Sequence, residues 1–230
     1  LGFCVLAPMG DSIAKLLGDV VPLGQLILVR FGVQVALLLP LVLLSRRVLR
    51  MTPRLLWLTL LRTLLHITGI GAMFLSLRFL PLADAIAIAF VMPFIMLLLG
   101  KYVLGEEVGP RRLIACAVGF VGTMLVVQPS FAAVGPPALL PLLVAVVFSL
   151  FMLVTRHVAK EIDPMTLQTV SGGMAVVILM PVILLGTQLE WAELTLVAPD
   201  PRTWVMLGAL GTLGTFAHLL MTWSLRFVPS

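Results

Sequence analysis

Hydrophobic positions form long blocks along this chain, and short polar or proline-containing stretches separate the blocks. Runs of about 17 to 25 apolar residues have the length that crosses a bilayer as a helix, and Pro and Gly mark the turns between them. The runs lie near residues 1–17, 22–44, 55–77, 80–100, 112–128, 138–155, 165–186 and 203–225. The pattern therefore predicts an all-α integral membrane protein with eight spanning helices and short loops.

An internal repeat relates the two parts of the chain. The hexapeptide Ser-Leu-Arg-Phe-Leu-Pro at residues 76–81 returns as Ser-Leu-Arg-Phe-Val-Pro at residues 224–229. A second set of positions also matches, namely Lys15 with Arg156 and Pro40 with Pro181. These matched positions lie seven residues closer together than the two hexapeptides do. One insertion of seven residues in the stretch 186–202, relative to 45–54, accounts for the difference. Two related halves with a substrate site between them are typical of secondary transporters.

The repeat divides the chain into a first half of five helices, residues 1–128, and a second half, residues 129–230, that holds helices six to eight. Because each repeat has an odd number of helices, the second is expected to insert upside down relative to the first. We expect ten helices in two inverted repeats, with about eight in this chain. Two further helices would complete the second repeat.

Composition and charge placement support a membrane location. Hydrophobic residues make up 61% of the chain and charged residues only 11%, compared with about 25% charged residues in soluble domains. The net charge of +5 calls for no nucleic-acid partner, because most basic residues fall in alternate loops. These are Arg46, Arg47, Arg50, Arg54, Lys101, Arg111, Arg112, Arg156, Lys160 and Arg226. The positive-inside rule then predicts that these loops and the amino terminus are cytoplasmic, in a multi-pass protein of the inner membrane.

Three short motifs carry a family resemblance. They are Leu80-Pro-Leu-Ala-Asp-Ala-Ile-Ala-Ile-Ala-Phe-Val-Met-Pro93, Leu104-Gly-Glu106 and Gly119-Phe-Val-Gly122. They resemble the EamA domain of the drug/metabolite transporter superfamily, and within it the amino-acid exporters of the YddG type. The resemblance implies two inverted five-helix repeats around a central cavity, lined mainly by helices one, three, four, six, eight and nine. An arginine in the family's second helix would be matched by Arg30.

Two histidines at membrane depth are the first candidates for a binding site, since ionisable groups there are costly and usually functional. His66 lies in the middle of the third apolar run and His218 in the eighth. Under the repeat, His218 corresponds to Ile70, one helical turn from His66 on the same face. Both histidines are therefore expected to line the cavity. The alternative is that a neighbouring helix satisfies each of them without any substrate contact.

A proline near the centre of the fourth run marks the second candidate region. Pro93 would free the carbonyl of Ala89 and bend the helix, and broken helices at mid-membrane point to binding sites. Phe90 and Phe94 flank it and would either contact substrate or pack on neighbouring helices. The rest of the predicted apolar wall consists of Ile70, Met73, Phe148 and Met152.

Other charged residues are weaker candidates. Arg30 would grip a carboxylate or, as we favour, form a pair within the bundle, and Arg62 would extend toward the cytoplasm. Asp11 and Lys15 are spaced to bond along one helix face. Close helix packing is predicted at Gly208, Gly211 and Gly214, and at the pair Gly119 and Gly122. Glu106 and Glu107 are expected at the interface, as caps or loop pairs.

These observations favour a secondary transporter that works by alternating access, with no catalytic residues, no metal site and no cofactor. The chain has no phosphate-binding loop and no His or Cys cluster with metal-ligand spacing. The substrates predicted best are amino acids with aromatic or apolar side chains, moved outward. The alternatives are an uptake carrier for a nucleoside-like compound or a sugar, and, with less support, a membrane-embedded enzyme or receptor. We expect a functional monomer, with a dimer as the alternative.

Overall fold

The structure, a computed structural model, describes residues 2–45, 50–103, 105, 109–127 and 135–227, and these contain helices and no strand. The α-helices of these described residues are α1 (Gly2–Leu17), α2 (Leu23–Leu44), α3 (Pro53–Phe79), α4 (Leu82–Ala89), α5 (Met92–Val103), α6 (Pro110–Val127), α8 (Leu139–Val158), α9 (Pro164–Gln188) and α10 (Pro201–Phe227). Two short 3₁₀ turns are η1 (Pro136–Ala138) and η2 (Ala192–Leu194). Each predicted run is helical, the fourth run as the two helices α4 and α5, so the all-α prediction is confirmed.

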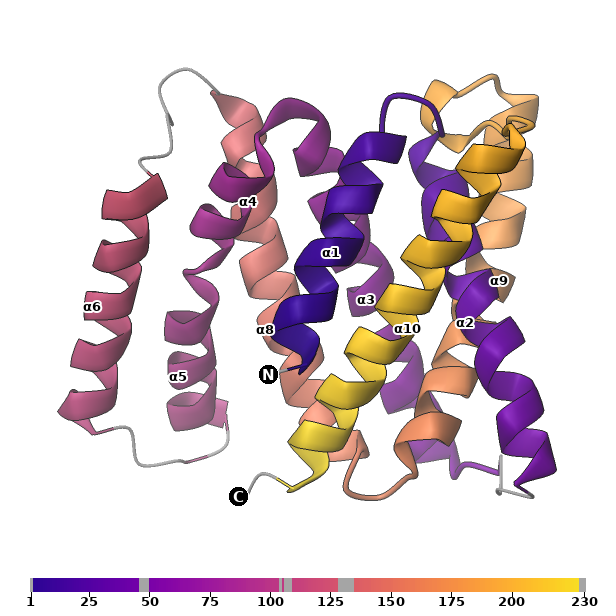
Figure 1. Cartoon of the computed structure of the whole chain (residues 1–230). Coiled ribbons are helices and arrows are strands. Elements are labelled where there is room, and N and C mark those ends of the chain that lie inside the picture. The colour runs from indigo at the N-terminus through magenta and orange to yellow at the C-terminus, as the bar shows by residue number, and fades with distance from the viewer. Residues whose placement is uncertain (1, 46–49, 104, 106–108, 128–134, 228–230) are drawn as a thin grey trace.

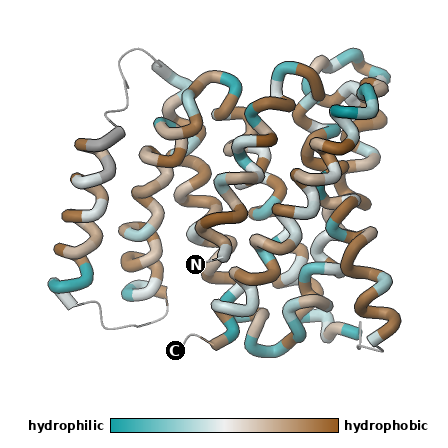
Figure 2. Tube along the Cα trace, in the orientation of Figure 1, coloured by the Kyte–Doolittle hydropathy of each residue, from teal (hydrophilic) through white to brown (hydrophobic). Residues whose placement is uncertain are grey.

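Six segments of the described chain are long and apolar enough to cross a membrane. They are Leu23–Leu44, Pro53–Phe79, Leu82–Val103, Pro136–Val158, Pro164–Gln188 and Pro201–Phe227. α1 has 16 residues and α6 has 18. Hydrophobic residues dominate the middle of the helices and hydrophilic ones gather toward the loops at both ends (Figure 2). This is the distribution of a multi-pass membrane protein.

Proline and a polar cap set the start of the long helices. Asp163 accepts hydrogen bonds from the backbone N–H groups of Met165 and Thr166, both at 3.1 Å, and Pro164 takes the first position of α9. Thr52 and Pro53 begin α3 in the same way. A cap satisfies backbone donors that a helix leaves free, and proline fits where no N–H is needed. The turn signals of the sequence therefore become helix starts.

The helices run alternately between two ends of the bundle. We call the end at the top of Figure 1, with residues 18–22 and 189–200, the upper face, and the opposite end, with residues 159–163, the lower face. α1, α2 and α3 run up, down and up, whereas α8, α9 and α10 run down, up and down (Figure 1). The directions agree with inverted halves. The division at residue 128 stays a prediction.

The contacts between helices of the two halves also show the symmetry of the repeat. α1 packs on α10 and α3 packs on α8, while α2 packs on α9. Replacing each helix by its counterpart in the repeat turns the α1–α10 contact into the α8–α3 contact. α6 packs on α4 and α5 and lies at the edge of the bundle (Figure 1). The centre of the molecule is therefore formed by helices of both halves.

Two glycines of α10 allow a close approach to α2. A β-carbon at Gly211 would lie 2.5 Å from Val33 Cβ, and one at Gly214 would lie 2.8 Å from Arg30 Nε. A β-carbon at Gly208 would meet no heavy atom within 4 Å. The predicted close packing is therefore present at Gly211 and Gly214. It was wrong at Gly208, and also at Gly119 and Gly122, where a β-carbon would again meet no heavy atom within 4 Å.

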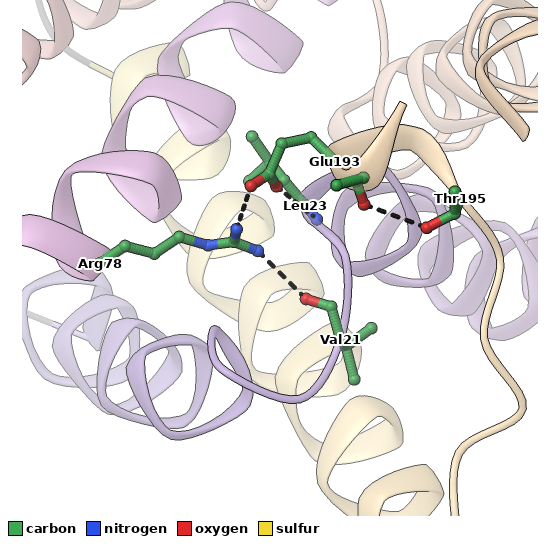
Figure 3. A network of polar contacts seen from close by, with 6 residues as sticks. Val21, Leu23, Arg78, Glu193 and Thr195 are labelled. Carbon is green, nitrogen blue, oxygen red and sulfur yellow. Dashed lines mark hydrogen bonds and ion pairs between the residues drawn. The ribbon is translucent and has the colours of Figure 1, made fainter. Parts of the chain in front are cut away.

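Polar contacts join the halves at the upper face (Figure 3). Arg78, near the end of α3, forms an ion pair with Glu193 of η2 and donates a hydrogen bond to Val21 O at 3.2 Å. Glu193 also accepts from the backbone N–H of Leu23 at 3.3 Å. Nearby, Gln25 donates to Val197 O at 3.0 Å and accepts from Val197 N at 2.9 Å. The segment before α10 is thereby held against α2 and α3.

Candidate functional site

A cavity of about 300 Å³ lies at membrane depth between helices of both halves. α1, α3, α4 and α5 form it with α8 and α10, and Arg30 reaches it from α2. Six of the residues predicted from the sequence line it: Ile70, Met73, Phe90, Pro93, Phe148 and His218. Most of the wall is apolar, which is the usual character of a pocket for an organic ligand. That these six side chains contact a substrate stays a prediction.

Two of the predicted residues, Phe94 and Met152, lie outside the cavity wall. Phe94 packs edge-on against Phe120, with ring centroids 5.9 Å apart. Met152 is partly buried beside Phe151 and Met221. Both residues sit on helices that line the cavity, but on faces turned toward other helices. Helical spacing alone does not fix which face is turned inward.

His66 is fully buried behind the cavity rather than in its wall. Its ring stacks on Phe151 with centroids 4.5 Å apart, meets Phe31 edge-on at 5.1 Å and lies 4.4 Å from the His218 ring. Neither ring nitrogen has a hydrogen-bond partner among the described residues. The two predicted histidines do come together, but His218 lines the cavity and His66 does not.

The helix break predicted at Pro93 is present. α4 ends at Ala89, α5 begins at Met92, and Pro93 occupies the second position of α5. The backbone N–H of Phe90 bonds to both Ile86 O and Ala87 O, which is the tightened geometry of a helix end. Since proline has no N–H to donate, the break falls where the ladder loses a bond. It places Phe90 and Pro93 in the cavity wall.

Arg30 is the principal polar group of the cavity, and it has no carboxylate partner among the described residues. Its side chain is 4% exposed, its Nη2 lies 3.1 Å from His218 Nδ1, and its Nη1 has no partner. The missing side chain of Gly214 leaves room for the guanidinium. The favoured pairing within the bundle is thus a contact with a histidine, not an ion pair.

The protonation of His218 follows from its neighbours. An arginine can only donate, so the Arg30 contact requires His218 Nδ1 to accept and places the ring proton on Nε2. Nε2 has no partner among the described residues. The other tautomer would instead donate from Nδ1 to Gly214 O, which is 3.0 Å away. In the first arrangement, one arginine N–H and one histidine N–H remain free to donate.

A carboxylate that the sequence reasoning missed also lines the cavity. Asp11 was expected to bond with Lys15, but Lys15 Nζ donates to Leu77 O and Leu80 O, each at 2.8 Å. Asp11 is partly buried and has no ion pair or hydrogen bond among the described residues. The sequence does contain an indication that Asp11 faces the bundle interior. Asp11 shares a helix face with the small residues Ala7 and Ala14, and small residues favour close helix packing.

Arg62 lies below the cavity and does not extend toward the membrane surface as expected. It is 0% exposed, donates to Thr155 Oγ1 and Ser171 Oγ at 2.9 Å each, and lies over the Phe151 ring at 4.6 Å. The hydroxyl groups and the ring belong to the second half, and Arg62 Nη2 is buried without a hydrogen-bond partner among the described residues. Glu106 and Glu107, expected at the interface, lie outside the described residues.

Comparison with known proteins decides the family. The model of the EamA-like transporter family matches residues 5–128, more than half of the chain. The chain belongs to the EamA-like transporter family. This is a family of transporters and not a class of enzymes, as the sequence resemblance implied. A solved structure with 20% sequence identity has a TM-score of 0.71 and is matched over 98% of this chain and 77% of its own, which supports the same fold.

Several curated relatives are transporters. A riboflavin transporter of Rhizobium johnstonii is 35% identical over 52% of this chain and 42% of its own length. A riboflavin transporter of Brucella anthropi is 26% identical over 70% of this chain and 56% of its own. An S-adenosylmethionine uptake transporter of Rickettsia prowazekii is 23% identical over 92% of this chain and 69% of its own length. The chain spans about half the length of the two riboflavin transporters.

Proposed function

We propose that this protein is a secondary transporter that moves small organic metabolites across the cytoplasmic membrane by alternating access. The observation that carries the proposal is the central cavity, which is walled by helices of both halves and contains a buried arginine. Rocking of two related halves around such a site exposes it to one side at a time. The helices of one chain surround the cavity, so a single copy is enough for this proposal.

The placement of charge supports the orientation in this proposal. The described basic residues of the lower face are Arg50, Arg54, Lys101, Arg111, Arg112, Arg156, Lys160 and Arg226, whereas Asp19, Glu190, Glu193 and Asp200 lie at the upper face. By the positive-inside rule, the lower face is cytoplasmic. The repeats 1–128 and 129–230 would then insert in opposite orientations, with the amino terminus on the cytoplasmic side.

The substrate class we favour is an amino acid with an aromatic or apolar side chain, moved outward. The apolar wall with Phe90 and Phe148 suits such a side chain, and Arg30 suits a carboxylate. Because Arg30 lies in the cavity wall, a carboxylate of a ligand there would have a guanidinium as its partner. The relatives give specific support to a second candidate, transport of a riboflavin-like compound.

Counterflow in proteoliposomes tests the proposal. The purified protein is reconstituted, the vesicles are preloaded with unlabelled compound, and entry of labelled phenylalanine, riboflavin or S-adenosylmethionine is followed. We expect phenylalanine to exchange, and Arg30→Gln to slow exchange much more than Arg202→Gln, which alters an exposed arginine at the start of α10. Exchange of riboflavin without phenylalanine would favour the second candidate. If none of these compounds exchanges, the proposed function is wrong.

A further inference from the structure

We propose that Asp11 and Arg30 form a divided charge site that selects a zwitterionic ligand, with Asp11 binding its cationic group and Arg30 its carboxylate. The inference rests on the proposed function and names the substrate class of the same cavity. It begins from the two charged side chains of the cavity wall. Of the described residues that line the cavity, Asp11 and Arg30 are the two charged ones, and they carry opposite charges.

The two charges share a depth in the membrane. At 1.5 Å per residue, Asp11 lies about 9 Å below the upper end of α1 and Arg30 about 10 Å below the upper end of α2. Both helices start or end at the same face (Figure 1). A ligand in the cavity would therefore meet both groups at one level, with its apolar part free to lie against Phe90 and Phe148.

The charges are held apart, although pairing would stabilise them. No ion pair or hydrogen bond joins Asp11 to Arg30 among the described residues. Arg30 is instead held by His218 at 3.1 Å, in the space that the missing side chain of Gly214 leaves. An unpaired charge removed from water is costly, and more so at membrane depth. The arrangement leaves this cost to be offset by a ligand that carries both opposite charges.

The hydrogen-bonding capacity of each group fits its assigned partner. Arg30 Nη1 and His218 Nε2 are both buried, and neither has a hydrogen-bond partner in the part of the chain that the structure describes. With Arg30 Nη2 donating to His218 Nδ1, both of these free atoms are donors, and a carboxylate has two oxygens to accept from them. Asp11 offers only acceptors when ionised, which suits an ammonium or sulfonium group. A ligand without charged groups would leave Asp11 and Arg30 with only their mutual electrostatic attraction across the cavity, and neither would gain a hydrogen-bonded counter-charge.

The test is a ligand series in which each charge is blocked in turn. Binding of labelled phenylalanine to the reconstituted protein is competed with phenylalanine, phenylalanine amide, N-acetylphenylalanine and N-acetylphenylalanine amide. The amide lacks the carboxylate, the acetyl compound lacks the cation, and the last compound lacks both. For the unmodified protein we expect each singly blocked compound to bind at least about tenfold more weakly than phenylalanine.

Two variants assign each preference to its residue. Asp11→Asn should remove the preference against N-acetylphenylalanine and keep the preference against the amide. Arg30→Gln should remove the preference against the amide and keep the preference against N-acetylphenylalanine. The matched controls are Asp19→Asn and Arg202→Gln, which neutralise exposed charges and should leave both preferences unchanged. Elution of each variant as a single species in size-exclusion chromatography checks its folding.

Several outcomes would overturn the inference. Equal binding of N-acetylphenylalanine and phenylalanine to the unmodified protein would mean that Asp11 does not bind the ammonium group of the ligand. Equal binding of all four compounds would exclude charge selection altogether, and neither result depends on a variant folding. Exchange of riboflavin with no exchange of any zwitterion would also overturn it and leave the transporter proposal intact. Absence of any exchange would instead refute the proposed function.

Discussion

At the scale of single residues, two buried arginines have different environments. Arg62 donates to Thr155 and Ser171 and lies over the ring of Phe151, so polar and aromatic groups of the second half surround it. Arg30 has one histidine partner and faces the cavity. A guanidinium is stabilised by hydroxyl groups and ring faces even without a carboxylate. We therefore assign a structural role to Arg62, and Arg30 is the arginine that a ligand in the cavity can contact.

A cysteine in the cavity wall gives a direct test of where substrate binds. Cys4 is free, exposed and lines the cavity, whereas Cys116 lies on α6, at the edge of the bundle. In a Cys116→Ala background, we expect a methanethiosulfonate reagent to slow transport several-fold, because the added group would occupy part of the cavity. Substrate present during the reaction should slow the modification, measured by the remaining transport rate.

The control for this experiment uses the other cysteine. In a Cys4→Ala background, the same reagent reacts only with Cys116, and transport should be unaffected. Modification of Cys4 that leaves transport unchanged would show that the substrate does not pass through this cavity.

At the scale of secondary-structure elements, α10 positions the site through its glycines. Gly214 lies where the Arg30 side chain crosses α10, and a β-carbon there would be 2.8 Å from Arg30 Nε and Nη2. The end of an arginine side chain is flexible, so the helix can tolerate an alanine if the guanidinium moves away. The backbone packing of α10 against α2 thus also determines where the charge lies.

Gly214→Ala is therefore expected to weaken substrate binding and leave the fold intact. Loss of one charge-assisted hydrogen bond costs about 1.5–3 kcal/mol, which weakens affinity at least about tenfold. Gly208→Ala is the matched control, since a β-carbon there meets no heavy atom within 4 Å. Substrate affinity by competition and thermal stability of both variants are the measurements. Equal affinities for the two variants would contradict this account.

The elements were easier to predict than the faces they present. Long apolar runs gave the helices, and Pro93 gave the break between α4 and α5, because both depend on residues close in sequence. Asp11 and His66 were misplaced, because their surroundings depend on helices far away in sequence. Asp11 was assigned to a local partner, Lys15, whose side chain instead reaches the end of α3. Spacing along one helix does not reveal such a competitor.

At the scale of the whole molecule, polar contacts at the upper face join the first half to the segment before α10. Arg78 and Glu193 form one link, and Gln25 and Val197 form another (Figure 3 shows the first). In the proposed transport cycle, these links must break for the cavity to open on this side. Glu193 is 47% exposed, so the ion pair is partly screened by solvent.

Glu193→Gln should favour opening at the upper face. A partly exposed ion pair contributes about 0.2–1 kcal/mol, so opening should increase at most about fivefold. The measurement is the rate at which a membrane-impermeant thiol reagent, added on the upper side, modifies Cys4 in the Cys116→Ala background. Glu190→Gln is the control, because Glu190 is exposed in the same loop and has no ion pair among the described residues. A rate no higher than in the control would mean that this link does not restrain opening.

The division of charge in the cavity has a stereochemical consequence. Asp11 and Arg30 provide two fixed points for an amino acid, and the apolar wall at Phe90 and Phe148 provides a third. Three different contacts that do not lie on one line can be satisfied together by only one hand of a chiral molecule. In the mirror image, the side chain would point away from the apolar wall whenever both charges are paired. The cavity would then discriminate between L- and D-amino acids through its geometry alone.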